Sequence, residues 1–385
     1  FLNGVNQAWV NYGNDFGNGQ GAATLPTFKA TFAGVAASGG NSVRIWLHCG
    51  CDSTPAFSKT TPGLVVATDG GANTLVSDLV AMYDAAHVSG IVINLSLFNG
   101  AVEMPENEKA LIESPTNTQS YIDVVLKPLL AAVKGHPAAG LFEVFNEPEG
   151  SVAAGVKTGS PCTDTTLLAG TGAGWTGSSV SMPDLQRFAG TIAAAIHAAD
   201  SDALVTVGSW CERSSTTSFG YFDYWADHCL LEASKAAAGT LDIRQMHSYA
   251  YQNKFSPHSP FMQSAADYNL SKPLILGEFS QVGSPSPPWN ISIQYNHACK
   301  EGYAGGWGWQ ANGGGQGADS FATLQAGMRS VCTGAPNPAP APCTDIPPSS
   351  DYTCAQQKLW GKCGDSWMKG YCCKTCFDCS PTCGQ

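Results

Sequence analysis

The chain has 385 residues, of which 43% are hydrophobic and only 13% are charged. Its formal net charge of −11 argues against a nucleic-acid-binding protein, because that binding needs cations that neutralise phosphates. No apolar run reaches the roughly 18 residues of a membrane span, and the chain starts without the basic and apolar segments of a signal peptide. We therefore expect a mature protein that acts outside the membrane on an electrically neutral partner.

Fifteen cysteines indicate an oxidising compartment, so the protein is expected to be secreted. Seven of them lie in residues 1–332 and eight in residues 343–385. The segment between, residues 333–342, reads TGAPNPAPAP, a composition typical of an extended linker. The sequence thus predicts a large first domain over 1–332, a Pro-rich linker over 333–342 and a Cys-rich module over 343–385.

Short apolar strands alternate with amphipathic helical patterns throughout the first domain, which indicates a parallel sheet covered by helices. Helices are expected over Leu75–His87, Tyr121–Lys134, Leu185–Ala199 and Ser292–Lys300. Strands are expected near Gly4–Trp9, Ser42–Leu47, Ile91–Leu97, Leu141–Phe145, Ala203–Val207, Asp242–His247, Leu274–Glu278 and Gly305–Trp309. Eight such units predict an α/β fold, a closed (β/α)8 TIM barrel. The competing open sheet would carry a Gly-rich phosphate turn after its first strand, and none is present there.

Two glutamates follow apolar strands at the positions where a barrel presents its catalytic groups. Glu147, in Asn-Glu-Pro, ends the fourth predicted strand, and Glu278, in Gly-Glu-Phe, ends the seventh. Each alone is a common ion-pair or capping residue, but a pair across one barrel can flank a single bond. We expect Glu147 as general acid/base and Glu278 as nucleophile of a retaining glycoside hydrolase, about 5 Å apart.

The first 332 residues resemble glycoside hydrolase family 5. The spellings Val-Arg44-Ile-Trp, Asn146-Glu-Pro, His247-Ser-Tyr249 and Trp307-Gly-Trp309 are most similar to the animal, mollusc-type β-1,4-mannanases. This resemblance implies hydrolysis of mannan, glucomannan or galactomannan. One departure is that the third strand ends at Asn99 without the His that many family members have there.

The other residues of these spellings are expected to bind substrate or support the carboxylates. Arg44 is placed to pair with the nucleophile, and Asn146 to donate to the sugar 2-hydroxyl. His247 and Tyr249 are two residues apart, so they share a strand face toward the nucleophile. Trp307 and Trp309 also share a face and offer platforms for a sugar, with Trp307 favoured by the resemblance.

The C-terminal module spaces Cys373, Cys376, Cys379 and Cys383 like an iron–sulfur cluster motif. Disulfides are the better interpretation, because the Pro that ends such a motif is missing and four more cysteines crowd the same segment. Trp360, Trp367 and Tyr371 are equally consistent with a sugar-stacking strip and with the filling of a small core. No metal site is expected in the barrel.

These observations predict a secreted, monomeric endo-β-1,4-mannanase that needs no metal or other cofactor, because two carboxylates supply the chemistry. An endo-β-1,4-glucanase on the same scaffold is one alternative, since mannan and cellulose differ only at C2. A catalytically inactive polysaccharide-binding protein is another, and it would bind mannan without releasing reducing ends.

Overall fold

The structure, a computed structural model, describes residues 1–250, 253–284, 289–332, 345, 347, 352–368 and 371–377. The chain divides into two compact units, Phe1–Ala335 and Pro336–Gln385. The predicted linker, residues 333–342, lies outside the described residues.

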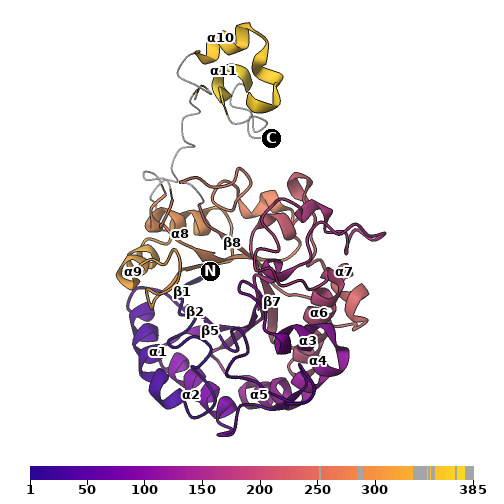
Figure 1. Ribbon diagram of the computed structural model, residues 1–385. Helices are drawn as coiled ribbons and strands as arrows, with labels where there is room; N and C mark the ends of the chain where they lie inside the picture. Colours follow the sequence, from indigo (N-terminus) through magenta and orange to yellow (C-terminus); the bar gives the residue numbers. More distant parts are fainter. Residues whose placement is uncertain are drawn as a thin grey trace. The chain divides into compact units, whose positions relative to one another are not determined.

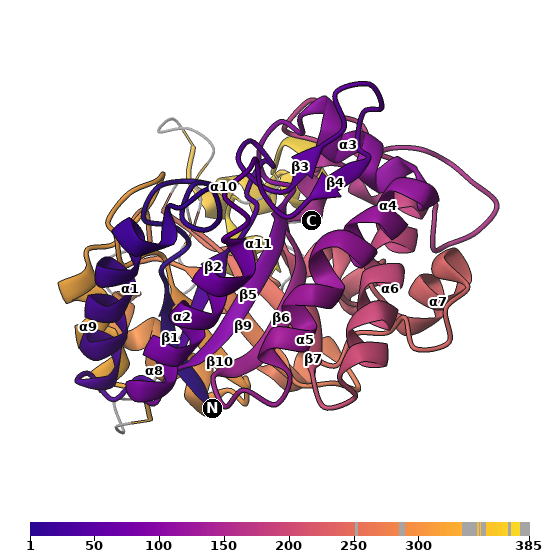
Figure 2. The same ribbon diagram turned by 90° about the horizontal axis from the view of Figure 1, so that it is seen from below.

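Eight parallel strands of the first unit close into a barrel, which confirms the predicted fold (Figure 1). The strands follow one another around the barrel in chain order, and the last pairs with the first. They are β1 (Leu2–Asn6), β2 (Ser42–Trp46), β5 (Val92–Asn99), β6 (Ala139–Asn146), β7 (Leu204–Ser209), β8 (Arg244–Ser248), β9 (Leu274–Phe279) and β10 (Gly305–Gly308). A small antiparallel sheet, β3 (Ala56–Phe57) with β4 (Val65–Ala67), lies at the carboxyl end of the barrel strands (Figure 2).

Helices surround the strands as an outer layer (Figure 1). They are α1 (Gly21–Ala36), α2 (Leu75–Val88), α3 (Glu106–Glu113), α4 (Pro115–Tyr121), α5 (Lys127–Val133), α6 (Met182–Ala199), α7 (Asp227–Ser234), α8 (Ile291–Lys300) and α9 (Phe321–Arg329). Ser181, Asn290 and Ser320 each accept a hydrogen bond from a backbone N–H of the first turn of α6, α8 and α9, which fixes where these helices begin. No helix of the described residues is long and apolar enough to cross a membrane.

Most predicted elements differ from the observed ones by a few residues at their ends, and two of these differences have a structural reason. The first strand ends at Asn6 rather than Trp9, because its parallel pairing with β2 stops at the Asn6 and Arg44 pair. The helix expected over Tyr121–Lys134 is one part of a longer helical segment, in which α4 and α5 are joined by a π-helical stretch, Ile122–Leu126. The apolar period alone did not reveal this irregular turn.

Each unit contains disulfides of its own, as the cysteine content predicts. The first unit has Cys162–Cys229 and Cys299–Cys332. The second has Cys354–Cys372 and Cys363–Cys376, and the latter removes Cys376 from any iron–sulfur cluster. Three cysteines of the described residues are free thiols: Cys49, Cys51 and Cys211.

The second unit contains α10 (Cys354–Leu359), α11 (Cys373–Phe377) and short 3-10 turns at Lys362–Gly364 and Ser366–Met368. Its hydrophobic core consists of Cys354, Met368 and Cys372. The side chains of Trp360 and Trp367 are both 49% exposed. Among the described residues of this unit, Trp360 and Trp367 lie outside the core, which contradicts the core-filling interpretation for these two side chains.

Candidate active site

Glu147 and Glu278 meet at the carboxyl end of the barrel. Glu147 directly follows β6, the fourth barrel strand, and Glu278 lies near the end of β9, the seventh. Their side chains are 13% and 6% exposed. One oxygen of each carboxyl group and one ring nitrogen of His247 all lie within 4.8 Å of one another. The two carboxyl groups can therefore contact opposite sides of one bond.

The backbone at Glu147 leaves the strand sharply. Glu147 has a φ of 45° and a ψ of 57°, the left-handed conformation, and Pro148 starts a 3-10 turn directly after it. Its amide donates to the Gly208 carbonyl of β7 at 2.7 Å, which holds the strained residue in place. The side chain reaches His247, whose Nδ1 lies 2.7 Å from Oε1 of Glu147 and 3.6 Å from Oε2 of Glu278.

The electrostatic surroundings favour a protonated Glu147. Burial, followed by the nearby Glu149, raises its pKa to about 8. Burial also lowers the pKa of His247 to about 4, so its imidazole is neutral near neutral pH. A carboxylic acid that keeps its proton at neutral pH can serve as a general acid.

Glu278 is held by two donors. Arg44 Nη1 donates to its Oε1 at 2.6 Å, and the Tyr249 hydroxyl donates to its Oε2 at 2.8 Å. Burial raises the pKa of Glu278, and the positive charge of Arg44 and the Tyr249 hydrogen bond act in the opposite direction. Both donors bind the ionised carboxylate better than the protonated acid. The ionised carboxylate is the form that a nucleophile requires.

Arg44 is fully buried, and the structure reveals a second acidic partner that the sequence analysis missed. Its Nε donates to Oε2 of Glu143 at 2.7 Å, and its Nη2 donates to Oε1 of the same carboxylate. The remaining N–H groups donate to Asn6, Asn146 and Glu278, so all five donors of the guanidinium are used. Glu143 could have been noticed in the sequence, because it is the charged residue within the otherwise largely apolar strand that ends at Asn146.

Glu143 collects further donors around the barrel. Asn94 Nδ2 and Gln245 Nε2 each donate to it at 2.7 Å, and Ser96 Oγ donates at 3.0 Å. Burial raises the pKa of Glu143, but the charge and hydrogen bonds of Arg44 and the hydrogen bond of Gln245 outweigh burial and hold this pKa below the usual range. The fully buried Glu143 therefore forms a fixed anionic layer beneath the guanidinium of Arg44.

Asn146 is oriented from both ends of its amide. Its Oδ1 accepts from Arg44 Nη2 at 2.7 Å, and its Nδ2 donates to Asn99 Oδ1 at 2.8 Å. Asn99 is the last residue of β5, the strand end where the sequence analysis noted the lack of a His, and its own Nδ2 donates to the Tyr12 hydroxyl at 3.1 Å. The departure at the third barrel strand thus still supports Asn146.

The two tryptophans of the last strand lie at different heights. Trp309 is 6% exposed and packs in a cluster with Trp46 and Trp9, next to Tyr249. Trp307 is 0% exposed and packs deeper in the barrel, where its Nε1 donates to Ser42 Oγ at 2.9 Å. The geometry therefore contradicts Trp307 as a sugar platform. Neighbouring residues on one face of a strand are about 6.6 Å apart along the strand. Trp307 and Trp309 therefore share a face but lie at different distances from the catalytic end of the barrel.

Aromatic side chains also gather on the side of Glu147. Trp175 and Trp210 have ring centroids 5.3 Å apart, and Trp175 is 42% exposed. Its Nε1 donates to the Ala101 carbonyl at 3.0 Å, just beyond β5. Trp210 directly follows β7, so both indoles lie at the carboxyl end of the barrel strands.

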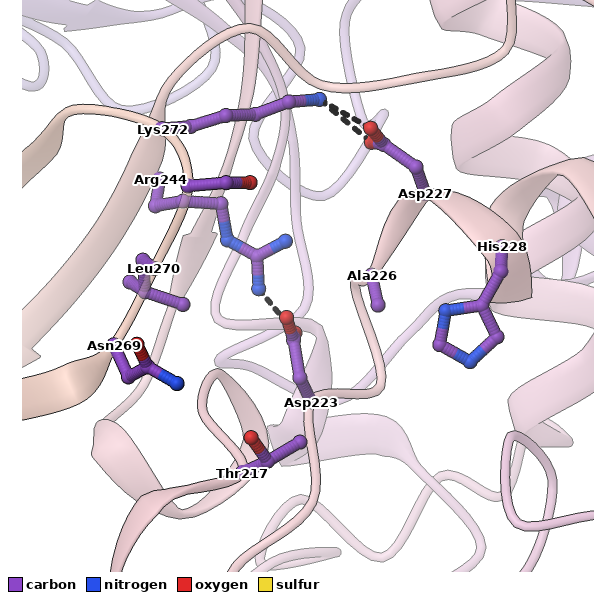
Figure 3. Close-up of a pocket in the computed structure, with 10 residues that line it drawn as sticks. Thr217, Asp223, Ala226, Asp227, His228, Arg244, Asn269, Leu270 and Lys272 are labelled. Carbon is purple, nitrogen blue, oxygen red and sulfur yellow. Dashed lines mark hydrogen bonds and ion pairs between the residues drawn. The ribbon is translucent and has the colours of Figure 1, made fainter.

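A separate cavity of about 410 Å³ is lined by Arg244, the first residue of β8, and by Lys272, which precedes β9, together with residues of neighbouring loops. Figure 3 shows these lining residues. Its two cationic side chains are already paired, Arg244 with Asp223 and Lys272 with Asp227 (Figure 3). The cavity therefore contributes nothing to the site that contains Glu147 and Glu278.

Two groups in the described residues have metal-ligating atoms close together. Cys162, His228 and Cys229 form one group, but its two thiols are joined in a disulfide. Glu147, His247 and Glu278 form the other. The carboxyl groups of this second group already bind Arg44, Tyr249 and His247, an arrangement suited to acid–base and nucleophilic chemistry.

Known proteins are similar to this chain in sequence and in fold, although no protein-family model matches the chain. The chain is 40% identical over 311 residues to a mannan endo-1,4-beta-mannosidase of Mytilus edulis, and this match covers 80% of this chain and 83% of that protein. It is also 40% identical over 332 residues to a mannan endo-1,4-beta-mannosidase of Cryptopygus antarcticus, a match that covers 86% of this chain and 85% of that protein. The crystal structure of an endo-1,4-beta-mannanase from Eisenia fetida matches with a TM-score of 0.83 and 44% identity over 86% of this chain and 90% of that chain. The chain belongs to the family of the mannan endo-1,4-beta-mannosidases, which are glycoside hydrolases, and the resemblance found in the sequence is confirmed.

Proposed function

We propose that the protein hydrolyses internal β-1,4 linkages of mannan-type polysaccharides with retention of anomeric configuration. The observation that carries this proposal is the pair of carboxyl groups, with oxygens within 4.8 Å of each other at the carboxyl end of the barrel. Retaining enzymes separate their carboxyl groups by about 5 to 5.5 Å, whereas inverting enzymes need roughly 6.5 to 9.5 Å for a water.

The proposed reaction has two steps. In the first, Glu147 gives its proton to the glycosidic oxygen while Glu278 attacks the anomeric carbon, so that the C–O bond breaks and a glycosyl ester with Glu278 forms. In the second, Glu147 removes a proton from water, which attacks the same carbon and releases Glu278 as a carboxylate. Glu147 is again protonated and Glu278 again ionised at the end. The configuration at the anomeric carbon has been inverted twice and is therefore retained.

The neighbouring side chains have separate roles in this proposal. Arg44 and Tyr249 hold the attacking oxygens of Glu278 at hydrogen-bond distance. His247 fixes the carboxyl group of Glu147. Asn146, oriented by Arg44, offers its remaining N–H to the sugar 2-hydroxyl, a contact that strengthens in the oxocarbenium-like transition state. Trp309 is the proposed platform beneath the sugar.

Mannan is the proposed substrate because the relatives carry that activity in their names, and those names do not favour a cellulase or an inactive binding protein. A neutral polysaccharide also suits a chain of net charge −11 with few cations. The disulfides support a secreted protein. We further propose that it acts as a monomer.

The stereochemistry of the first product tests the mechanism. The purified protein is mixed with mannohexaose, and proton NMR follows the anomeric signals before mutarotation. Retention predicts that the β-anomer of the new reducing end appears first. Initial appearance of the α-anomer would refute the double displacement, and turnover of carboxymethyl cellulose without turnover of mannan would refute the substrate.

We also propose that residues 343–385 are a polysaccharide-binding module. Its half-exposed Trp360 and Trp367 lie outside its core, and indoles exposed in this way can stack on the C–H face of sugars. Deletion of 343–385 should leave hydrolysis of soluble oligosaccharides intact and weaken adsorption to insoluble mannan. Unchanged adsorption would refute the binding role.

A further inference from the structure

Glu149, two residues beyond the proposed acid, is a carboxylate that the mechanism does not use. It is 0% exposed. Its Oε1 accepts from Ser214 Oγ at 2.6 Å, Trp225 Nε1 at 2.8 Å and Ser209 Oγ at 3.1 Å. Its Oε2 accepts from the Trp210 amide at 3.1 Å. The side chain thus ties the loop after β6 to the end of β7 and to the chain beyond it.

The contacts of Glu149 suit a carboxylate that only accepts hydrogen bonds. All four partners are donors, and only an ionised carboxylate is purely an acceptor. No Lys, Arg or His among the described residues forms an ion pair with it. A buried charge without a cationic partner is costly. The negative charge itself is therefore the feature to explain.

The charge lies close to Glu147 through a rigid connection. The turn Pro148–Ser151 starts directly after Glu147, and the Gly150 amide donates to the Glu147 carbonyl at 3.1 Å. Glu147 is anchored on Gly208 of β7, and Glu149 on the next residue, Ser209. The acid and the buried carboxylate are thus fixed to the same strand end, and their burial weakens the screening of the charge by solvent.

The other titratable and charged groups around Glu147 come from four strands. His247 on β8 is neutral near neutral pH, and Arg44 on β2 is paired with Glu143 on β6 and with Glu278 on β9. Tyr249 beyond β8 donates to Glu278. Glu143 and Glu278 already share Arg44, and no ion pair among the described residues joins Arg44 to Glu149.

We propose that Glu149 is a positioning residue whose buried negative charge keeps Glu147 protonated into the neutral and mildly alkaline range. This inference rests on the proposed function of Glu147 as the acid. It agrees with the causes of the raised pKa of Glu147, among which Glu149 is the largest contribution of any charged neighbour. Glu149 thereby sets the alkaline limit of activity without touching the substrate.

The direct test titrates Glu147 itself. Carboxyl signals of protein labelled with 13C at the glutamate side-chain carboxyl are followed by NMR against pH, and the Glu147 signal is assigned as the one missing in Glu147→Gln. In Glu149→Gln, the midpoint of Glu147 should fall by about one pH unit, the size expected for loss of one nearby like charge. The matched control is Ser214→Ala, which removes one hydrogen bond to Glu149 but keeps its charge, and its midpoint should stay at the parent value.

Kinetics give a second readout. The alkaline limb of the pH profile of kcat/KM should move in Glu149→Gln by the same unit, an approximately fivefold loss at pH 8 relative to pH 5, while the acidic limb stays in place. An unchanged Glu147 midpoint in folded Glu149→Gln would overturn the inference. If Glu149→Gln does not fold, the variants Glu149→Asp and Trp225→Phe test the inference instead. Both keep the negative charge at position 149, so the titration midpoint of Glu147 should stay at the parent value, and a lowered midpoint in either variant would overturn the inference.

The titration separates this inference from the proposed function. It needs no turnover, so a protein that fails to hydrolyse mannan would refute the proposed function while the midpoints still test the effect of Glu149. Conversely, mannan hydrolysis with a midpoint that does not respond to Glu149→Gln would refute only the inference.

Discussion

Replacement of the proposed acid by Gln should stabilise the protein, and increasingly so as the pH rises. In the folded protein the pKa of Glu147 is raised to about 8 from an ordinary 4.5, mainly by burial. Between these two values the unfolded chain has released this proton and the folded protein still holds it. The unfolded state then binds fewer protons, so the free energy of unfolding falls with rising pH. Glu147→Gln removes this dependence.

The magnitude follows from the two pKa values. A difference between 4.5 and about 8 corresponds to at most about 5 kcal/mol at pH 8. An unfolding entropy of about 2.1 cal/mol/K per residue gives roughly 0.7 kcal/mol/K for the first unit, Phe1–Ala335. The melting temperature of Glu147→Gln should therefore equal that of the parent near pH 4 and exceed it by up to about 7 °C at pH 8.

Calorimetry of both proteins at pH 4, 5, 6, 7 and 8 measures this difference. The matched control is Glu113→Gln on α3, where the carboxylate is 41% exposed and pairs with Lys109 at the surface. Its difference from the parent should be small and show no comparable trend. A difference for Glu147→Gln that is flat across pH, or that becomes more negative as the pH rises, would refute the buried, protonated Glu147.

Arg44→Met should lower stability by about 3 to 5 kcal/mol near neutral pH, because Glu143 then becomes a buried carboxylate without its cation. The loss should shrink at low pH, where that carboxylate can protonate, and equal melting temperatures of variant and parent at pH 7 would contradict the network. Trp309→Ala should raise KM for mannohexaose about tenfold, in line with loss of one aromatic contact of roughly 1.5 kcal/mol, whereas Trp307→Phe should leave KM unchanged and lower the melting temperature. The opposite pattern of KM values would restore Trp307 as the sugar platform.

The barrel and its two carboxylates could be predicted because their signals are local. Each strand is a short apolar run, and Glu147 and Glu278 stand where such runs end. In a barrel, that position alone places a side chain at the catalytic end. Arg44, His247 and Tyr249 followed from the same logic and from the family spelling.

Residues whose surroundings depend on strand register could not be predicted in this way. The five donors around Glu143 come from β2, β5 and β8, so only the closed barrel brings them together. Glu149 depends on where the chain beyond β7 folds back to bring Trp225 against it. Trp307 was misplaced because alternation along a strand gives the face of a side chain but not its depth.

The module shows the same limit at a smaller scale. Its aromatic residues have the composition of a core, yet two disulfides and Met368 occupy the interior and leave Trp360 and Trp367 half-exposed. The connectivity of the cysteines decides this arrangement, and the sequence does not determine that connectivity.

The most direct test of the central claim is reducing-sugar release from mannan and from cellulose, measured side by side with the parent protein and with Glu278→Ala. We predict that the parent hydrolyses mannan in preference to cellulose and that Glu278→Ala, folded as judged by its melting curve, loses this activity by several orders of magnitude. Mannan hydrolysis that survives in folded Glu278→Ala would contradict the assignment of the nucleophile and with it the two-carboxylate mechanism.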